Sequence, residues 1–401
     1  MKDEATLFEI MQGLDNNEFV LHYQPKISLL TGKIIGAEAL IRWQRGSKMV
    51  PPVEFIPHCE RTGFTPFLTK RVIHLLSDDI RKMLVDSETC NQLHFAVNVS
   101  GHDLKIDHLN LLLFGTQLEH KIDYHRLQFE LTETVLSEMS TVSINRMKEF
   151  VNAGISLALD DFGTGFSSLS VLVTYPFSLI KLDKSIVDFV TRDNKADNIS
   201  SANIRMAHRI GLRVVAEGIE DSATYNRLLL SGCDQGQGYF LSKPLERGEF
   251  VNLVNSSKKW PGKPIGLIYQ AQMDHLQWRK DLLELYYCTE PDIIGMALGN
   301  FSHRNIRDHS TCNLGRWYFG DGLEYKDLQE FKAINQPHEM FHEIGYQLVE
   351  LIRSDKSRED GLGLLRQLNI LSSVIIGLLQ DLEHAVYRMT THSHYDTAMN
   401  P

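Results

Sequence analysis

The sequence predicts an α/β domain, either a closed (β/α) barrel or a doubly wound sheet, followed by an all-helical domain. Two observations predict this division. Segments typical of strands alternate with segments typical of helices up to about residue 250, and beyond the polar stretch SSKKWPGKPIG (256–266) only helical spacing of apolar residues remains. A length of 401 residues, at about 150 residues per domain, agrees with two or three domains.

The α/β part opens with two strand segments, 19–28 and 34–42, whose connection is too short to hold a helix. We therefore expect a hairpin, because parallel strands need a longer crossover. The other segments that predict strands are 95–99, 127–132, 156–161, 179–183, 213–217 and 237–241. The helical segments that can cross between them are 66–85, 140–152, 198–210 and 221–231.

The part beyond the polar stretch carries apolar residues at helical spacing. Its helical segments are 269–288, 323–333, 336–353 and 359–390. We expect the α/β domain to cover 1–255, the linker 256–266, the helical domain 267–390 and a loose polar tail 391–401.

Composition and charge exclude several classes of protein. Lys and Arg number 41 against 51 Asp and Glu, and this net charge of −10 argues against binding a nucleic-acid polymer. The amino terminus lacks the pattern of a signal peptide, and we find no window of about 18 apolar residues. The five cysteines form no CxxC pair. We therefore expect a cytoplasmic protein that does not span a membrane.

Polar side chains alternate with apolar ones near the ends of six predicted strands. In a barrel, alternate side chains point inward, and those at the carboxyl ends face the mouth where barrel enzymes hold their active sites. Carboxylate and amide oxygens are the ligands that Mg²⁺ or Mn²⁺ prefers. The oxygen set is Glu38, Asn98, Glu130, Asp160, Asp161 and Glu217, with Arg42, Lys181 and Asp183 on the same strands.

Each of these residues also has a simpler explanation. A single inward carboxylate is often ion-paired or solvated, Lys181 can be a structural ion-pair partner, and DDFGTG can be an ordinary glycine-rich loop. The coincidence across strands favours a metal site, because every buried charge would otherwise need its own partner. Metal ions held by carboxylates also let an acidic protein bind phosphate esters.

The residues at these strand ends resemble the EAL-domain family of cyclic di-GMP phosphodiesterases over about residues 5–255. The strings that carry the resemblance are YQPKI (23–27), EALIR (38–42), NVS (98–100), ELTE (130–133), DDFGTGFSSL (160–169), IKLDKS (180–185), AEGIE (216–220) and QGYFLSKP (237–244). The resemblance implies a TIM-like (β/α)8 barrel whose first strand runs antiparallel to the others. It also implies two-metal hydrolysis of cyclic di-GMP to linear pGpG.

The resemblance assigns a role to individual residues. The first metal ion would be held by Glu38, Asn98, Glu130 and Asp160, and the second would be held by Asp160 and Asp161. The residues that would position and help deprotonate the attacking water are Glu217 and Lys181, with Gln237 in support. The expected substrate contacts are Gln24 at guanine, Arg42 at phosphate, and Asp183. Glu133 would anchor the 161–169 loop, and Glu220 lies in a loop near the family's dimer face.

Two alternatives to catalysis on cyclic di-GMP remain. The first is a degenerate member of the family that only binds the nucleotide or a partner protein, and the second is an enzyme that acts on another cyclic or linear nucleotide. The sequence has lost none of the expected metal ligands. One departure is Asp103, where a Gln is common in the family, and this position lies beyond the ligand strand.

A second set of metal-binding residue types occurs in the helical part. His338 and His342 are four residues apart and project from one face of a helix. This spacing alone is weak evidence, but Cys312 and His275 occur nearby in DHSTCNLGRWYFGDG and DHLQWRKDLLEL. Three imidazoles and one thiolate form a closed tetrahedral zinc set.

These strings resemble the chemoreceptor zinc-binding (CZB) domain, a four-helix bundle, over about 270–385. The resemblance assigns one Zn²⁺ to His275, Cys312, His338 and His342, with His303 and His309 as alternative ligands. We expect zinc occupancy or oxidation of Cys312 to alter the barrel through a homodimer interface, and a signalling protein is a possible partner. The simpler alternative is a permanently filled structural zinc.

Overall fold

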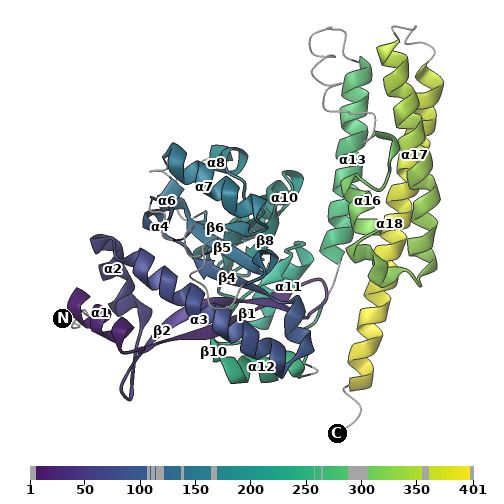
Figure 1. Ribbon diagram of the computed structural model, residues 1–401. Coiled ribbons are helices and arrows are strands. Elements are labelled where there is room, and N and C mark those ends of the chain that lie inside the picture. Colours follow the sequence, from purple (N-terminus) through teal and green to yellow (C-terminus); the bar gives the residue numbers. More distant parts are fainter. Residues whose placement is uncertain are drawn as a thin grey trace. The chain divides into compact units, whose positions relative to one another are not determined.

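The structure is a computed structural model of the full chain. It describes residues 6–105, 109, 113, 122–136, 140–163, 169–256, 258–262, 265–287, 306–354 and 361–397. The chain divides into two compact units, the barrel unit (Met1–Lys263) and the helical unit (Pro264–Pro401), which Figure 1 shows in purple to green and in green to yellow.

The barrel unit is built on a closed barrel. Its staves are β1 (Phe19–Ser28), β2 (Ile34–Arg45), β4 (His94–Asn98), β5 (Leu127–Thr132), β6 (Ser156–Phe162), β7 (Leu179–Leu182), β8 (Arg213–Ala216) and β9 (Gln235–Gly236). β1 pairs antiparallel with both β2 and β9, whereas the remaining neighbours pair in parallel. The predicted barrel with an antiparallel first strand is therefore confirmed, and the doubly wound sheet is excluded. The short strands β3 (Lys48–Val50) and β10 (Leu245–Glu246) extend the sheet beyond it.

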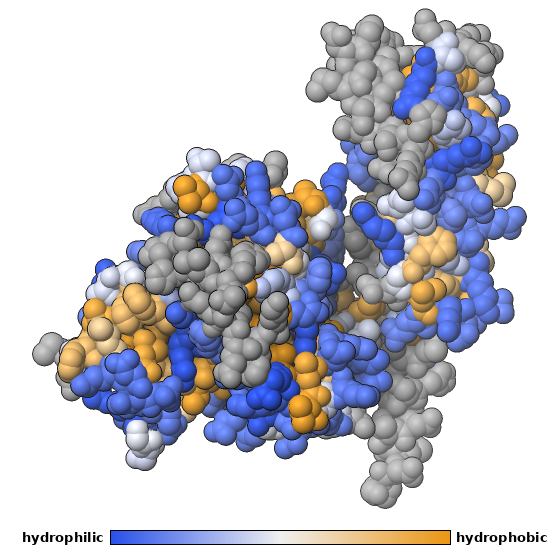
Figure 2. Space-filling view, viewed as in Figure 1, coloured by the Kyte–Doolittle hydropathy of each residue, from blue (hydrophilic) through white to orange (hydrophobic). Residues whose placement is uncertain are grey.

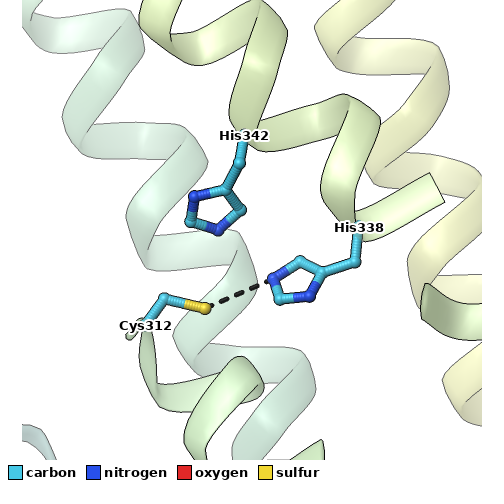
Figure 3. Close-up of side chains that lie close together, drawn as sticks. All are labelled: Cys312, His338 and His342. Carbon is cyan, nitrogen blue, oxygen red and sulfur yellow. Dashed lines mark hydrogen bonds between the residues drawn. The ribbon is translucent and has the colours of Figure 1, made fainter. Parts of the chain in front are cut away.

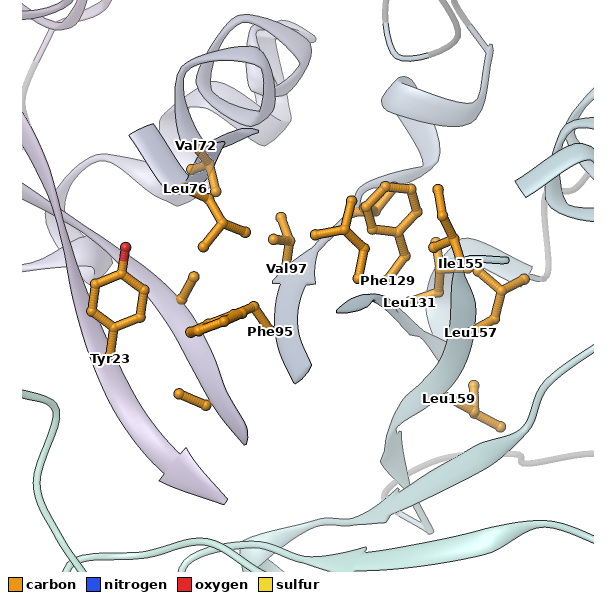
Figure 4. Packing of buried hydrophobic residues seen from close by; sticks show 14 of the residues in the cluster. Tyr23, Val72, Leu76, Phe95, Val97, Phe129, Leu131, Ile155, Leu157 and Leu159 are labelled. Atoms are coloured by element: carbon orange, nitrogen blue, oxygen red, sulfur yellow. The ribbon is translucent and has the colours of Figure 1, made fainter. Parts of the chain in front are cut away.

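The helices of the barrel unit cover the outer face of the strands. They are α1 (Leu7–Asp15), α2 (Ile56–Thr62), α3 (Thr65–Asp86), α4 (Gly101–Lys105), α6 (Glu133–Leu136), α7 (Thr141–Asn152), α8 (Leu169–Thr174), α9 (Lys184–Val187), α10 (Asn194–Arg209), α11 (Ser222–Leu230) and α12 (Arg247–Asn255). Val72 and Leu76 of α3 pack over Phe95 and Val97 of β4 (Figure 4). Each such buried side chain contributes about 1.5–3 kcal/mol. The outward face of these strands thus packs against helices. The inward face carries the polar residues near the mouth, together with a separate small apolar cluster of Ala158, Leu179 and Val215.

The last predicted strand, 237–241, is wrong. The final stave is β9, which ends at Gly236, although the Gln237 backbone N–H still donates to the Ala216 oxygen of β8 at 2.9 Å. The chain then turns at Gly238. Only a glycine fits at this position, because a Cβ there would lie 2.2 Å from the backbone oxygen of Ile219. The apolar run that follows Gly238 therefore belongs to a turn at the mouth of the barrel.

The expected linker 256–266 is largely part of the barrel unit. The Trp260 side chain is buried in the barrel core cluster, and the Trp260 backbone N–H donates to the Gly32 oxygen at 3.0 Å. The Tyr225 hydroxyl donates to the Pro261 oxygen at 2.6 Å. The stretch is polar in composition, so the sequence predicted a linker. The buried Trp260 side chain nevertheless holds the stretch against the turn between β1 and β2.

The helical unit contains three long helices among its described residues. They are α13 (Ile265–Tyr287), α17 (Gln329–Arg353) and α18 (Leu362–Thr397), with the short α16 (Asn313–Tyr318) and the 3-10 turn η4 (Asp321–Tyr325) between them. The predicted segments 323–333 and 336–353 are not separate helices, because α17 continues through Pro337. α18 continues to Thr397, so most of the expected tail 391–401 is helical.

One described helix has the length and composition of a membrane span. A stretch of α18, Leu362–Val386, reaches a mean hydropathy of 1.7, although we expected no such window. Because a core helix passes the same test, this is weak evidence, but only 28% of the window is buried. Elsewhere, Figure 2 shows mainly hydrophilic side chains on the face in view, with apolar ones in separate patches.

Candidate functional site

A cavity of about 500 Å³ opens at the carboxyl ends of the parallel strands. Its lining residues are Gln24, Glu38, Asn98, Asp160, Lys181, Lys184, Glu217, Gly218, Glu220, Gln237, Gly238 and Tyr239. Most of the predicted polar positions therefore converge on one space. Glu130 is fully buried and lies within contact of Lys181 rather than on the cavity wall.

Lys181 lies among four of the predicted acids. Its Nζ is 2.6 Å from Glu130 Oε2, 2.7 Å from Glu217 Oε1, 3.1 Å from Asp160 Oδ1 and 3.9 Å from Glu38 Oε2. Burial alone lowers the pKa of a lysine, but these carboxylates raise the pKa of Lys181 well above its ordinary value. The ammonium therefore stays charged and offsets part of the acid cluster.

Glu130 is held by a second lysine that the sequence analysis did not single out. Lys26, on the antiparallel strand β1, places its Nζ 2.6 Å from Glu130 Oε1 and 2.9 Å from Gln128 Oε1. Burial tends to raise the pKa of Glu130, but Lys181 and Lys26 overcome this and lower the pKa to about 2. Each oxygen of this carboxylate thus faces its own ammonium group.

Asp160 and Asp161 form an irregularity in β6. The register with β7 shifts between Leu159 and Phe162, as in a β-bulge, and Asp161 adopts a φ of 54°. The Asp161 N–H donates to Asp160 Oδ1 at 2.9 Å. The bulge turns adjacent side chains to one side, so that ligand atoms of Asp160, Asp161 and Glu217 lie within 4.8 Å of one another.

The acids of this group resist ionisation because they are buried together. Burial raises the pKa of Asp160 to about 6 and that of Glu217 to about 8, and the neighbouring carboxylates add to the rise while Lys181 opposes it. Burial also raises the pKa of Asp161, with Asp183 as the next contributor. A cation bound here would replace protons, which makes the cluster suitable for divalent metal ions.

Amide groups fix the carboxylate of Glu38. Asn98 Nδ2 donates to Glu38 Oε1 at 2.7 Å, and Gln237 Nε2 donates to Glu38 Oε2 at 2.7 Å and to Gln24 Oε1 at 3.0 Å. Gln237 Oε1 is buried and has no hydrogen-bond partner among the described residues. A buried acceptor without a partner indicates that a ligand, water or ion completes the site.

Several predicted residues lie at the edge of this arrangement. Arg42 is half-buried near Glu38 and Tyr239, and its Nη1 donates to the Ile41 oxygen at 3.0 Å. Asp183 caps α9 by accepting from the Ser185 N–H at 2.8 Å. Glu220 forms an ion pair with Lys184 at the cavity rim. Glu133 begins α6, and its side chain lies outside the described part of the chain.

Sequence reasoning missed Lys184 and Tyr239 as well as Lys26. Lys184 lies next to the predicted Asp183, and Tyr239 lies in QGYFLSKP, where it was assigned to a strand. Tyr239 is 61% exposed at the cavity, and the Lys243 ammonium lies 5.6 Å from its ring centre. An exposed aromatic ring at a cavity rim is a suitable surface for stacking a base.

The helical unit brings three of the predicted zinc ligands together (Figure 3). The ligand atoms of Cys312, His338 and His342 lie within 4.8 Å of one another, with Cys312 Sγ 3.2 Å from His338 Nε2. His342 Nδ1 lies 2.5 Å from the Ile306 oxygen, so it is a donor and leaves Nε2 free. Burial lowers the pKa of His338 to about 2 and that of His342 to about 4, so both rings are neutral near pH 7.

The fourth predicted ligand, His275, is not among the residues whose ligand atoms all lie within 4.8 Å of one another. Its Nε2 lies 3.1 Å from Ser372 Oγ on α18, and its ring centre is 4.4 Å from that of Phe341. Burial lowers the pKa of His275 to about 3, with a further contribution from His342. The alternative ligand His309 has its ring centre 5.4 Å from that of His338, and His303 lies outside the described residues.

The donor set of this cluster fits zinc. Two neutral imidazoles and a thiol that can ionise are borderline-soft ligands of the kind that zinc prefers, and His338 turns Nε2 toward the sulfur. Cys312 also caps α16, where the Gly315 N–H donates to its Sγ at 3.2 Å. An amide that points at sulfur favours the thiolate.

Two family profiles match the chain. The profile of the EAL domain matches residues 9–244, and that of the chemoreceptor zinc-binding domain matches residues 275–349. The first match covers the barrel, and the second begins at His275 and includes Cys312, His338 and His342.

Curated relatives are similar over the barrel. The signaling protein YkoW of Bacillus subtilis is 34% identical over 256 residues, which cover 61% of this chain and 30% of YkoW. The probable cyclic di-GMP phosphodiesterase PdeB of Escherichia coli is 35% identical over 245 residues, covering 60% of this chain and 46% of PdeB. The chain therefore spans less than half the length of either relative.

Solved structures of similar fold include enzymes with bound nucleotides. The EAL enzyme Bd1971 in its cAMP and cyclic-di-GMP bound form has a TM-score of 0.58 at 31% identity, covering 62% of this chain and 68% of that chain. The PaMucR phosphodiesterase in complex with c-di-GMP has a TM-score of 0.55 at 28% identity, covering 61% of this chain and 98% of that chain.

Proposed function

The chain belongs to the EAL domain family, and from that premise we propose that it hydrolyses cyclic di-GMP to linear pGpG with the help of two Mg²⁺ or Mn²⁺ ions. The observation that carries the proposal is the juxtaposition of Asp160, Asp161 and Glu217 beside the charged Lys181 at one cavity. The relatives PdeB and PaMucR support the choice of substrate by their names.

The residues that would hold the ions are those already close together at the barrel mouth. They are Glu38, Asn98, Glu130 and Asp160 for one ion, and Asp160 and Asp161 for the other. When bound, such ions polarise the phosphodiester, lower the pKa of a water and stabilise charge on the attacking and leaving oxygens. Asn98 uses its amino group on Glu38, which leaves its carbonyl oxygen for a ligand.

Glu217 is suited to accept the proton of the attacking water. In the absence of a metal ion, burial raises its pKa to about 8, so this carboxylate has a higher proton affinity than an exposed glutamate. Lys181 Nζ, 2.7 Å away, keeps the side chain in place and supplies positive charge near the phosphorus. Gln237 supports the same site by fixing Glu38.

The nucleotide would contact the cavity rim and its walls. Gln24 would bind guanine, since its amide lies on the wall beside Gln237. Arg42 would bind a phosphate after its Nη1 leaves the Ile41 oxygen, and Asp183 would take part from the amino terminus of α9.

Incubation of the full chain with cyclic di-GMP tests this proposal. Chromatography should show pGpG in the presence of Mg²⁺ or Mn²⁺, and Glu38→Gln should lose most of the activity because it removes a charged ligand without changing the side-chain volume. Glu60→Gln, a substitution at an exposed carboxylate on α2, is the matched control and should keep the activity. No pGpG above the Glu38→Gln level with either metal would favour the alternative, a non-catalytic cyclic di-GMP or zinc sensor acting through protein contacts.

We further propose that one Zn²⁺ binds Cys312, His338, His342 and His275, and that zinc or oxidation of Cys312 regulates hydrolysis in a cytoplasmic homodimer, with a signalling protein as a possible partner. The cluster of Cys312 with two neutral imidazoles supports the metal. The test compares hydrolysis with and without a zinc chelator and in Cys312→Ser, while circular dichroism monitors the helices. An unchanged rate with folded helices would reduce the zinc to a structural role.

A further inference from the structure

The helix α18 has apolar residues on two opposite sides, and only one of these sides is buried in the core of the helical unit. Leu365, Leu368, Ile375, Leu379 and Leu382 are spaced three, four or seven residues apart, so they share one side of the helix, and they are buried in that core. On the opposite side the same spacing recurs at exposed positions, where Ile370 is 64% exposed and Val374 43% exposed.

The exposed stripe contains two open glycines. Gly363 and Gly377 lie seven residues on either side of Ile370, and a Cβ at either glycine would have no heavy atom within 4 Å. A glycine inside a helix costs about 0.5–1 kcal/mol relative to alanine. Nothing within the described helical unit fills the space beside Gly377, whereas another helix packed on this face would.

The stripe is self-complementary about a point between Ser373 and Val374. Reading α18 in opposite directions from that point exchanges Ile370 with Gly377 and Arg366 with Asp381. Two copies of α18 crossing antiparallel would therefore place an isoleucine over a glycine and a cation opposite an anion. A two-fold axis forms each of these contacts twice.

We propose that this face of α18, made of Arg366, Ile370, Ser373, Val374, Gly377 and Asp381, is a homodimer interface in which two copies of α18 pack antiparallel. A second copy of the chain fits better than a lipid surface, because Arg366 and Asp381 lie at matched distances from the centre of the stripe, and the exposed Arg388 follows further along the helix. A hydrocarbon environment would leave both charges unpaired, whereas the antiparallel dimer pairs them.

The size of the face sets the expected strength of association. Stable interfaces bury about 1,200–2,000 Å² in total, and a single pair of helices lies at or below the lower end. We therefore expect a monomer–dimer equilibrium that depends on concentration. The inference gives the proposed homodimer a surface, and its test does not use hydrolysis, so the two proposals can fail separately.

Charge reversal on the full zinc-loaded chain tests the pairing. Arg366→Glu and Asp381→Arg should each weaken the dimer about tenfold in sedimentation velocity, because each places like charges opposite one another at both ends. An equal mixture of the two variants should restore association, since a mixed dimer again pairs an acid with a base at each end. Association that is unchanged in the single variants and in the mixture counts against the pairing.

A cross-link keeps the test decisive if the chain also dimerises through its barrel. Ser373→Cys lies next to the proposed two-fold axis, so mild oxidation should join two chains. Ser354→Cys, at the exposed end of α17, is the matched control and should not. Absence of the Ser373→Cys cross-link would overturn the proposal. Binding of the chain to phospholipid vesicles would also overturn it if Ile370→Glu abolishes that binding, because the face would then belong to a membrane contact.

Discussion

Replacing Lys26 with methionine isolates the contribution of the second lysine to the barrel interior. The change keeps the length of the side chain but removes the ammonium that lies 2.6 Å from Glu130 Oε1 and 2.9 Å from Gln128 Oε1. The Lys26 and Glu130 side chains are 5% and 0% exposed, so water cannot replace the lost partner without opening the barrel.

The magnitude follows from what remains around Glu130. Breaking a buried ion pair by removing one partner costs about 3–5 kcal/mol. Lys181 still contacts the other oxygen at 2.6 Å, so we expect a loss at the lower end, about 3 kcal/mol. The matched control is Lys184→Met, which breaks an ion pair whose side chains are about half exposed and which should cost about 0–1 kcal/mol.

Hydrogen exchange measured by mass spectrometry reads out this loss within the barrel alone. Amides of β5 should exchange about 100-fold faster in Lys26→Met, because about 1.4 kcal/mol corresponds to a factor of ten. Urea unfolding of the full chain gives a second measure, although its two units need not unfold together. A loss in Lys26→Met no larger than in Lys184→Met would refute the reasoning.

The pH dependence gives the same prediction a second readout. The pKa of Glu130 is lowered from 4.5 to about 2, so its interactions stabilise the fold above pH 4.5 and this contribution disappears as the pH falls through 2. The difference between the wild-type chain and Lys26→Met should therefore be full at neutral pH and shrink between pH 4.5 and 2. A difference that stays constant over this range would indicate that packing of the lysine stem, not its charge, is the cause.

Three further measurements follow from the geometry. Mg²⁺ binding to the full chain should strengthen as the pH rises from 6 to 8 and level off above 8, because the ion displaces protons from Asp160 and Glu217. The pKa values of these two residues are raised to about 6 and about 8. Calorimetry in buffers of different ionisation enthalpy should record the released protons, and Glu217→Gln should reduce their number. Competition with a chromogenic chelator should show that Cys312→Ser lowers zinc affinity by at least about tenfold while His309→Ala does not, and the opposite order would make His309 a ligand. Gly32→Ala should lower the melting temperature more than Gly46→Ala. Both glycines have a positive φ, but only at Gly32 would a Cβ meet the Trp260 backbone oxygen. Equal losses in melting temperature would contradict the packing of the Trp260 segment against Gly32.

The alternation of polar and apolar residues along the strands was sufficient to predict the carboxylates of the site, but it did not predict Lys26, which pairs with Glu130. Asn98 is the last residue of β4, and Glu38 is the last residue of β2 that pairs in parallel with β4, so both lie where the rule for barrel mouths applies. Lys26 lies on the antiparallel β1, whose carboxyl end points the other way, so the same rule says nothing about it. Its pairing with Glu130 needs the barrel to close, which no local pattern reports.

The remaining differences have local causes that the sequence pattern conceals. Proline usually ends a helix because it lacks an N–H, yet Pro337 lies inside α17, and the sequence therefore predicted two segments. Asp103, the departure from the family's common Gln, is buried and accepts from the Ser100 N–H at 2.8 Å and from Ser100 Oγ at 2.5 Å. A shorter acidic side chain thus holds the turn that follows Asn98, which the sequence alone did not indicate.

Ser372 lies between His275, the proposed fourth zinc ligand, and the proposed dimer face, because its Oγ lies 3.1 Å from His275 Nε2 and its neighbour Ser373 lies at the proposed two-fold axis. With Nε2 engaged by Ser372, Nδ1 is the nitrogen left for a metal, and the hydrogen bond then fixes the ring. Ser372→Ala should therefore weaken zinc binding about 10–100-fold. Ser373→Ala, whose Oγ donates to the Asn369 oxygen on the same helix, should leave zinc binding unchanged. Tighter zinc binding in Ser372→Ala would show instead that Ser372 competes with the metal for Nε2.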